Sequence, residues 1–123
     1  KMTIKLPDNF FFGVALSGPQ TEGAYNVGGA LRSYWDMWSD QEINAFHNNV
    51  GSYVGNDMYH RYEEDIKLFK SMNFKSFRTS MQWTRLLDQM KYNPEGAAWY
   101  HKLIDVPMKT EYDIFMNMYH FVY

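Results

Sequence analysis

The sequence predicts an α/β fold in which strands and helices alternate, as they do in a parallel sheet or a β/α barrel. An apolar run at 10–16 is bounded by turn-forming residues, an amphipathic helix pattern covers 55–72, and apolar strand patterns cover 74–80 and 113–119. A second helix pattern separates the last two strands. The predicted order is therefore strand, helix, strand, helix, strand.

The first predicted strand is the segment FFFGVAL at 10–16. Only Gly13 interrupts its apolar residues, and such a run is typical of a strand buried on both faces of a parallel sheet. The pattern therefore predicts that the phenylalanines at 10–12 are buried. Gln20 and Glu22 follow the strand closely, where a β/α barrel carries the polar side chains of its binding face.

A long loop rich in Gly, Asn and Ser is predicted from Ser17 to about Tyr53, with a short helix in its SYWDMWS segment at 33–39. The helix at 55–72 carries Asp57 in its first turn, where a carboxylate favours the helix dipole. Its core face is formed by apolar residues at helical spacing: Met58, Tyr62, Ile66 and Phe69.

The second helix has a recognisable start and an uncertain end. Asn93 is a candidate N-cap, and Pro94 occupies the first helical position. Its apolar face is supplied by Trp99, Leu103 and Ile104. Pro107 falls where the helix should continue and would cost a backbone hydrogen bond. Either the helix ends near Asp105, or the local sequence is unusual.

Composition excludes several classes of partner. The 12 basic and 14 acidic residues form no long run of either sign, so we expect no nucleic acid and no polybasic membrane contact. The chain has no cysteine, and its histidines are scattered, so we expect no metal and no cofactor. The chain has neither a signal peptide pattern nor an apolar stretch of the roughly 20 residues that span a membrane. A cytoplasmic protein is the default expectation.

Aromatic residues make up 19% of the chain. Large rings bury much area each, so they suit a core built from few side chains. Exposed flat rings also suit a sugar site, because they stack on the C–H faces of a pyranose. Composition alone leaves both interpretations open.

Six segments resemble, in order and spacing, the glycoside hydrolase family 1 β-glycosidases, and especially their 6-phospho-β-glucosidases. They are FFFGVALSGPQTEGAYN, SYWDMWS, GNDMYHRYEEDIKLFKSM, FRTSMQWTRLL, YNPEGAAWYHKLID and DIFMNMYHF, and they cover nearly the whole chain. The resemblance implies the N-terminal β/α units of a (β/α)8 TIM barrel, incomplete in this chain, because a complete barrel needs about 250 residues. Residues 1–123 would then be the N-terminal part of a single TIM-barrel glycosidase domain.

The resemblance implies a parent protein that is a retaining 6-phospho-β-glucosidase. Such enzymes use two carboxylates about 5 Å apart, and the family carries them as glutamates in N-E-P and E-N-G motifs. Neither motif occurs in this sequence, so both catalytic glutamates are expected to lie outside this chain, and the chain alone is expected to be inactive. The expected partner is a small-molecule β-glucoside, 6-phosphorylated in the favoured interpretation. A non-phospho β-glucosidase or β-galactosidase, or an inactive sugar-binding or structural fragment, are the alternatives, and an oligomer is left open.

Two residues are candidates for substrate binding. The amide of Gln20 offers donors and an acceptor, which suits two neighbouring sugar hydroxyls, and the matching glutamine of the family binds the glycone. His120 is expected at the end of the third strand, and the matching family histidine also binds the glycone. The alternatives are a solvated loop glutamine and a histidine whose hydrogen bonds are satisfied at a strand end.

Arg78 interrupts an apolar strand, where an unpaired charge is costly, so we expect a partner carboxylate. The matching family arginine supports the nucleophilic glutamate. Glu22 is expected to have a structural hydrogen-bonding role, because the matching family glutamate is not catalytic. Trp83 and Arg85 are expected to pack at the barrel top, and Asp36 is expected to cap a turn.

Overall fold

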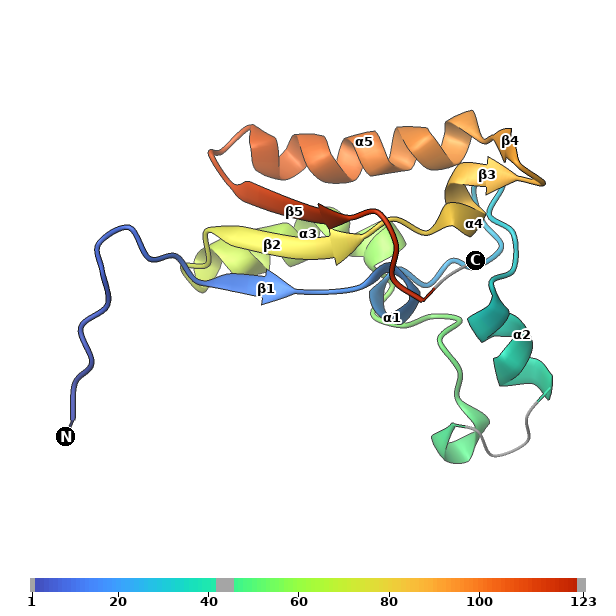
Figure 1. Cartoon of the computed structure of the whole chain (residues 1–123), viewed down its shortest axis with the longest axis horizontal. Helices are drawn as coiled ribbons and strands as arrows, with labels where there is room; N and C mark the ends of the chain where they lie inside the picture. The colour runs from blue at the N-terminus through green and yellow to red at the C-terminus, as the bar shows by residue number, and fades with distance from the viewer. Residues whose placement is uncertain (1, 42–45, 122–123) are drawn as a thin grey trace.

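A parallel sheet of three strands forms the centre of the molecule (Figure 1). The computed structural model describes residues 2–41 and 46–121. The strands are β1 (Gly13–Ala15), β2 (Ser76–Ser80) and β5 (Asp113–Asn117), and their order in the sheet is β1-β2-β5. In the register, Val14 lies opposite Phe77, and Phe77 lies opposite Ile114. The predicted α/β alternation with parallel strands is confirmed.

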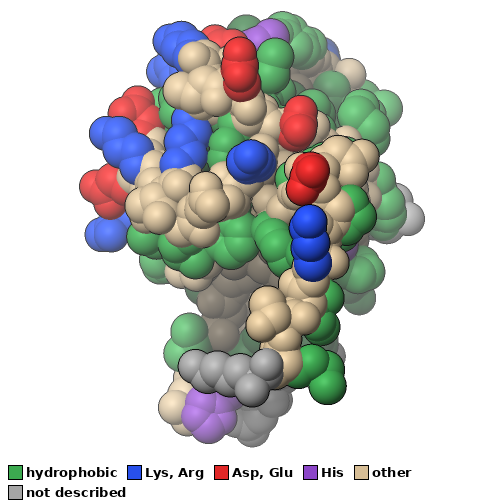
Figure 2. Space-filling view, turned by 90° about the vertical axis from the view of Figure 1, so that its left-hand side faces the viewer, with side chains coloured by type: hydrophobic (Ala, Val, Ile, Leu, Met, Phe, Trp, Pro, Cys, Tyr) green, Lys and Arg blue, Asp and Glu red, His purple; other side chains and the backbone are tan. Residues whose placement is uncertain are grey.

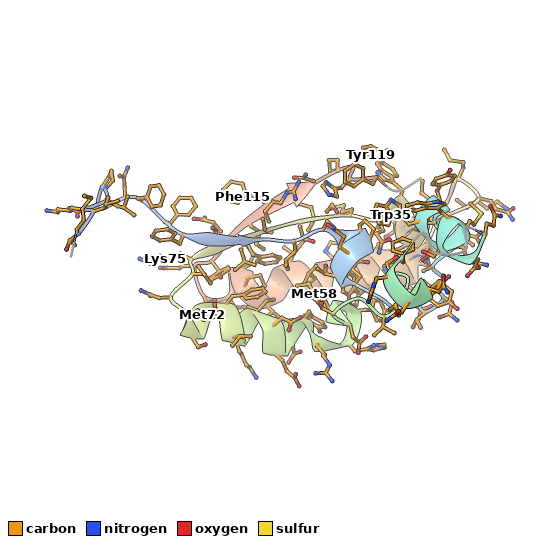
Figure 3. All side chains as sticks on the ribbon, turned by 90° about the horizontal axis from the view of Figure 1, so that it is seen from below. Trp35, Met58, Met72, Lys75, Phe115 and Tyr119 are labelled. Atoms are coloured by element: carbon orange, nitrogen blue, oxygen red, sulfur yellow. The ribbon has the colours of Figure 1, made fainter. Side chains whose placement is uncertain are left out.

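Two long helices, α3 (Met58–Ser71) and α5 (Pro94–Met108), lie on one side of the sheet (Figure 3). Apolar side chains from both helices bury the side chain of Phe77 on the central strand. The buried core comprises Met58, Ile66, Phe77, Trp99, Tyr100, Leu103 and Tyr112. The sequence pattern placed Met58, Ile66, Trp99 and Leu103 on these faces, and they are buried as expected.

Shorter elements follow the carboxyl ends of the strands. Helix α1 (Gly18–Thr21) follows β1, and α2 (Tyr34–Gln41) and a 3-10 turn (His47–Asn49) lie in the predicted loop, of which 42–45 fall outside the described residues. Helix α4 (Trp83–Leu86) follows β2 and leads into an antiparallel pair, β3 (Leu87–Asp88) and β4 (Lys91–Tyr92). The sequence analysis missed this hairpin.

The two long helices differ in how well their predicted ends agree with the structure. The Asn93 side chain accepts a hydrogen bond from Glu95 N, so the predicted N-cap of α5 is confirmed. Helix α3 begins one residue after Asp57, which adopts a left-handed backbone conformation, so the prediction of Asp57 within the first turn is wrong. Helix α5 continues through Pro107 to Met108, so the alternative that it ends near Asp105 is wrong, and Pro107 has no N–H to donate to a carbonyl oxygen of the preceding turn.

The first strand differs most from its prediction. Only Gly13–Ala15 pair with β2, and Phe10, Phe11 and Phe12 are 52%, 44% and 57% exposed. Burial on both faces requires neighbours that these residues lack within the described chain: their segment leaves the sheet as an extended arm (Figure 1). Phe11 instead stacks against Phe115 of β5, with ring centroids 6.4 Å apart.

The sheet face opposite the helices changes character along the strands. Phe11 lies before the beginning of β1, Arg78 and Phe115 lie opposite each other in the middle of their strands, and Asn117 lies at the carboxyl end of β5. Figure 2 views the molecule from the end at which the strands begin and shows charged side chains of both signs interspersed, with hydrophobic side chains below them. Within the described residues, no helix is long and apolar enough to cross a membrane.

Candidate functional site

Polar side chains from two neighbouring strands meet at the carboxyl end of the sheet. Arg78, on β2, lies opposite Phe115 of β5, and its Nη2 lies 3.4 Å from Nδ1 of His120, just beyond β5. Asn117 at the end of β5 can accept from Arg78 Nε at 3.3 Å when its amide oxygen faces the guanidinium. His120 lies three residues beyond β5 in a bend, so it follows the strand rather than ending it.

The carboxylate expected beside Arg78, which the resemblance places outside this chain, stays a prediction. In the described part of the chain, Arg78 forms no ion pair; its Nη1 donates to the carbonyl oxygen of Leu16 at 3.1 Å. The reason is its position: Arg78 is half-buried on the open face of the sheet, not in the core, so it keeps access to water. A neutral carbonyl and an imidazole therefore suffice as its partners here.

Gln20 lies on α1, after the strand that neighbours Arg78. Its side chain is exposed, and its Oε1 accepts a hydrogen bond from the hydroxyl of Ser17. Among the described residues, Gln20 makes no hydrogen bond to Arg78 or His120. The structure thus joins Arg78 to His120 directly and puts Gln20 on the same edge of the sheet, without contact.

Glu22 lies behind this edge in a fully buried polar cluster. Its Oε2 accepts from Arg85 Nε at 3.0 Å and from Gln82 Nε2 at 2.7 Å, and its Oε1 accepts from the Tyr100 hydroxyl at 2.7 Å. We call Glu22, Gln82, Arg85 and Tyr100 the hub. These bonds are consistent with the expected structural role of Glu22 and connect α1 to α4 and α5.

Arg85 is the cation of the hub, and its side chain is 1% exposed. Its guanidinium also donates to the carbonyl oxygens of Val27, Gly23 and Ala24. The guanidinium carbon lies 4.5 Å from the ring centre of Tyr59 and 5.5 Å from that of Trp99. Arg85 therefore has a carboxylate, carbonyl oxygens and aromatic faces around it, which is how a buried cation is compensated.

Burial dominates the acid–base behaviour of the hub. Desolvation raises the pKa of the Glu22 carboxyl above its ordinary value, against the opposing influence of Arg85 and the hydrogen-bond donors. Desolvation and the nearby Glu22 carboxylate raise the pKa of Tyr100 well above its ordinary value. Tyr100 therefore remains a neutral hydroxyl that can donate to Glu22 throughout the neutral range.

The sequence predicted that Arg85 packs at the barrel top, but it did not predict that Gln82 and Tyr100 donate hydrogen bonds to Glu22. A tyrosine on the apolar face of a predicted helix was the available signal, because a buried tyrosine hydroxyl generally needs a hydrogen-bond partner. No signal in the sequence pairs Gln82 with Glu22, since the contact spans sixty residues. Trp83 donates from its indole nitrogen to the carbonyl oxygen of Met118, which agrees with a packing role.

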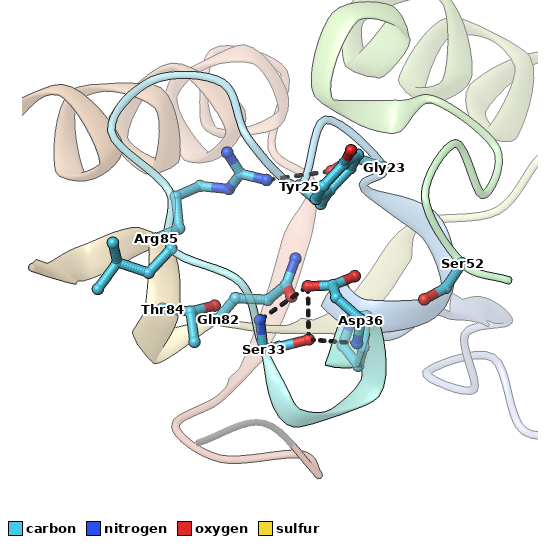
Figure 4. A pocket seen from close by; sticks show the side chains of 10 residues that line it. Gly23, Tyr25, Ser33, Asp36, Ser52, Gln82, Thr84 and Arg85 are labelled. Atoms are coloured by element: carbon cyan, nitrogen blue, oxygen red, sulfur yellow. Dashed lines mark hydrogen bonds between the residues drawn. The ribbon is translucent and has the colours of Figure 1, made fainter. Parts of the chain in front are cut away.

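A small polar cavity lies between the hub and the start of α2 (Figure 4). Asp36 Oδ2 accepts from Ser33 N and Ser33 Oγ at 2.7 and 2.8 Å, so the predicted turn-capping role of Asp36 is confirmed. The cavity has about 10 Å³ of free volume, which is room for about one water molecule. It is too small for a sugar ring.

An aromatic cluster adjoins His120. The ring of Phe121 lies 4.4 Å from that of His120 and 6.2 Å from that of Trp35 on α2. Trp38 and Phe46 complete the cluster at 5.1 Å from each other. Other rings, such as Trp99, are buried in the core, which confirms the core interpretation for them, whereas a sugar-binding role for the cluster at His120 stays a prediction.

Similar proteins share both the sequence and this fold. Beta-glucosidase 32 of Arabidopsis thaliana is 42% identical over 118 residues, which are 93% of this chain and 22% of that protein. The aryl-phospho-beta-D-glucosidase BglH of Bacillus subtilis (strain 168) is 37% identical, over 95% of this chain and 26% of that protein. The solved structure of an aphid myrosinase superposes with a TM-score of 0.90 at 30% identity, over 95% of this chain and 26% of that one.

The chain therefore spans about a quarter of the length of the relatives that it matches. Its structural neighbours are TIM-barrel enzymes, so its strands and helices correspond to part of such a barrel. Residues 2–122 match the description Glycosyl hydrolase family 1. This match covers nearly every residue, and the chain is a member of glycosyl hydrolase family 1.

Proposed function

We propose that this chain carries part of the glycone-binding site of a retaining β-glucosidase and forms the N-terminal part of a single barrel domain. The observation that carries the proposal is the contact between Arg78 and His120 at the carboxyl end of the parallel sheet, the edge on which Gln20 also lies. Active sites of barrel enzymes lie at this end of the strands. Family membership supports a glycoside as the ligand.

Each residue has a role in the proposal. The Gln20 amide and the His120 imidazole bind neighbouring hydroxyls of the glycone. Arg78 faces the place where a nucleophilic carboxylate would lie, and its positive charge would keep that carboxylate ionised. In the retaining reaction the nucleophile attacks the anomeric carbon while a second carboxylic acid protonates the leaving oxygen, and water then hydrolyses the glycosyl intermediate. The sequence contains neither an N-E-P nor an E-N-G motif, so this chain is proposed to bind without hydrolysing.

A 6-phosphorylated glucoside is the favoured ligand within this proposal. Support comes from the aryl-phospho-beta-D-glucosidase BglH and the 6-phospho-beta-glucosidase GmuD of Bacillus subtilis, at 37% and 33% identity. The plant beta-glucosidases at 42% identity support a non-phosphorylated β-glucoside as the second candidate. A cytoplasmic location remains a prediction from the sequence, and cell fractionation would test it.

The proposal is tested by titrating the chain with phenyl β-glucoside and phenyl 6-phospho-β-glucoside, following amide NMR shifts. We expect tighter binding of the phosphorylated compound, shifts centred on Gln20, Arg78 and His120, and no release of phenol. Gln20→Ala and His120→Ala should weaken binding about tenfold each, since each removes hydrogen bonds to the ligand. The matched controls are Gln89→Ala and His101→Ala, both at exposed positions elsewhere.

Three outcomes would contradict parts of the proposal. Equal effects of the site and control variants would remove Gln20 and His120 from the site. Tighter binding of the unphosphorylated glucoside would favour the second candidate. Release of phenol by the pure chain would show catalytic groups that the proposal places outside it.

A further inference from the structure

Gln20 stands on a turn of the chain that is fixed from several sides. Gly18 N donates to the Ser80 hydroxyl at 2.9 Å, and Tyr59 N donates to the carbonyl oxygen of Glu22 at 3.0 Å. The Glu22 side chain extends from the end of the same turn into the hub. Helix α1 is thereby bonded to β2, α3, α4 and α5, although it has only four residues.

Close packing restricts the same turn from behind. A Cβ added to Gly55 would lie 2.9 Å from the carbonyl oxygen of Gln20, and one added to Gly23 would lie 2.0 Å from that of Val54. Gly55 also has a φ of +53°, which side chains disfavour. The backbone around α1 therefore packs closely against residues 54 and 55, and the torsions of the Gln20 side chain set its direction from this turn.

Ser17 fixes those torsions. It is 2% exposed, and its carbonyl oxygen accepts from Gln20 N at 3.2 Å and from Thr21 N at 3.1 Å, so the residue itself is held in place by backbone bonds. Its hydroxyl donates to Oε1 of the exposed Gln20 side chain. This bond takes one of the two lone pairs of the amide oxygen and orients the amide, so that both N–H bonds of its NH2 group are left to donate to a ligand.

We propose that Ser17 is the positioning residue for Gln20, and that it makes Gln20 a hydrogen-bond donor towards the ligand. The proposal rests on the proposed function, in which Gln20 binds the glycone. An amide held in this way recognises acceptor oxygens, and the Arg78 guanidinium on the neighbouring strand presents only donors as well. The edge formed by Gln20 and Arg78 therefore selects a ligand face that offers oxygen lone pairs, as neighbouring sugar hydroxyls do.

Side-chain NMR relaxation tests the positioning without any ligand. In the wild-type chain, the heteronuclear NOE of the Gln20 NH2 group should approach that of Gln82, which is buried in the hub, and exceed that of exposed Gln89. Ser17→Ala should lower it to the level of Gln89. The matched control is Thr21→Val, which removes a buried hydroxyl from the same turn but no bond to Gln20. An unchanged Gln20 NOE in Ser17→Ala overturns the proposal.

Binding of phenyl β-glucoside tests the consequence for the ligand. Ser17→Ala should raise its Kd about three- to tenfold, the effect expected from losing one orienting hydrogen bond, and Thr21→Val should change it less than about twofold. A Ser17→Ala effect no larger than that of Thr21→Val overturns the proposal while leaving the proposed function intact. If Gln20→Ala does not weaken binding, the proposed function fails instead, and the NOE comparison still decides the role of Ser17.

Discussion

Two arginines seven residues apart, Arg78 on β2 and Arg85 on the helix that follows it, place their charges in different surroundings. Arg85, in the short helix after the strand, is buried and bonded to Glu22, backbone carbonyls and aromatic faces. Arg78, on the strand itself, is half-buried and meets a backbone carbonyl and His120. The buried arginine donates to the Glu22 carboxylate and to three backbone carbonyl oxygens, whereas the strand arginine keeps a solvent-facing side on the open sheet.

The difference shows that apolar neighbours in the sequence do not determine how a charge is compensated. Successive strand residues point to opposite faces, so Phe77 enters the core while Arg78 points away from it. Among the described residues a carboxylate pairs with Arg85, seven residues later, and none pairs with Arg78. We infer that Arg85 stabilises the fold, while Arg78 is available to a ligand or to a carboxylate at the sheet edge.

Removing the carboxylate of the hub should have the largest effect. Glu22→Ala leaves the buried Arg85 cation without its partner and should lower the free energy of unfolding by about 3–5 kcal/mol. Urea unfolding followed by tryptophan fluorescence measures the change. Glu22→Gln is the control, because it retains the shape of the side chain and should lose less. A loss below about 1 kcal/mol for Glu22→Ala would mean that water reaches Arg85, and the contrast with Arg78 would disappear.

Tyr100→Phe should have an intermediate effect and a distinctive pH dependence. It leaves Glu22 Oε1 without its donor and Gln82 N without its acceptor, so about 1–3 kcal/mol of stability should be lost. Burial raises the pKa of Tyr100 well above 10.0, so above that pH the unfolded chain releases this proton while the folded chain retains it. The wild type therefore loses stability as the pH rises above 10.0.

The comparison of wild type and Tyr100→Phe isolates that contribution. Tyr62 and Tyr112 also have raised pKa values, but both remain in the variant and contribute the same slope to each protein. Urea unfolding at about pH 9 and about pH 11 should thus show a smaller loss for Tyr100→Phe than for the wild type. Equal losses would show that Tyr100 ionises freely and is not sealed in the hub.

The sequence predicts the repeating elements of this fold better than its connections. The helical spacing of Met58 and Ile66 on α3, and of Trp99 and Leu103 on α5, predicts one buried face for each helix. All four residues are in the core. The run at 10–16 contains no information about whether neighbouring strands cover it, and its phenylalanines are exposed. Sequence pattern describes what an element can bury, while burial itself requires a partner.

The candidate site could be predicted only where local position determines it. Gln20 follows the carboxyl end of β1 on α1, and Arg78 lies in the middle of the neighbouring strand β2, as the order of elements implies. The bond between Ser17 and Gln20 depends on side-chain torsions, and the hub joins residues on four separate elements and loops. The alternation of strands and helices does not encode such contacts.

The hairpin that follows Arg85 offers a stabilising change. Gln89 and Met90 both have positive φ, 46° and 66°, where Asn and Gly are the favoured residues of a two-residue turn. The double replacement Gln89→Asn, Met90→Gly should raise the free energy of unfolding by about 1 kcal/mol, because it relieves backbone strain. Thermal unfolding measures the shift.

The hairpin change also bears on the hub. The hairpin returns the chain to Asn93, whose side chain donates to the carbonyl oxygen of Arg85 at 2.8 Å, so a firmer turn should support the buried arginine and leave Arg78 unaffected. Gln89→Asn alone is the control and should give the smaller part of the gain. A lower melting temperature in the double variant would mean that the exposed Met90 side chain contributes more than its backbone conformation costs.

Arg78→Ala should have the smallest effect on stability, although it removes a charge from the central strand. The lost bonds are one to the Leu16 carbonyl oxygen and one to His120, both at a half-buried site, so we expect a loss of about 1 kcal/mol or less in urea unfolding. The ring signals of His120 should nevertheless shift in NMR spectra, because its neighbour is gone. A stability loss equal to that of Glu22→Ala would show that the contacts of Arg78 on the open face stabilise the fold as much as the buried ion pair of the hub does. A small loss together with displaced His120 signals would support Arg78 as a residue retained for binding rather than for folding.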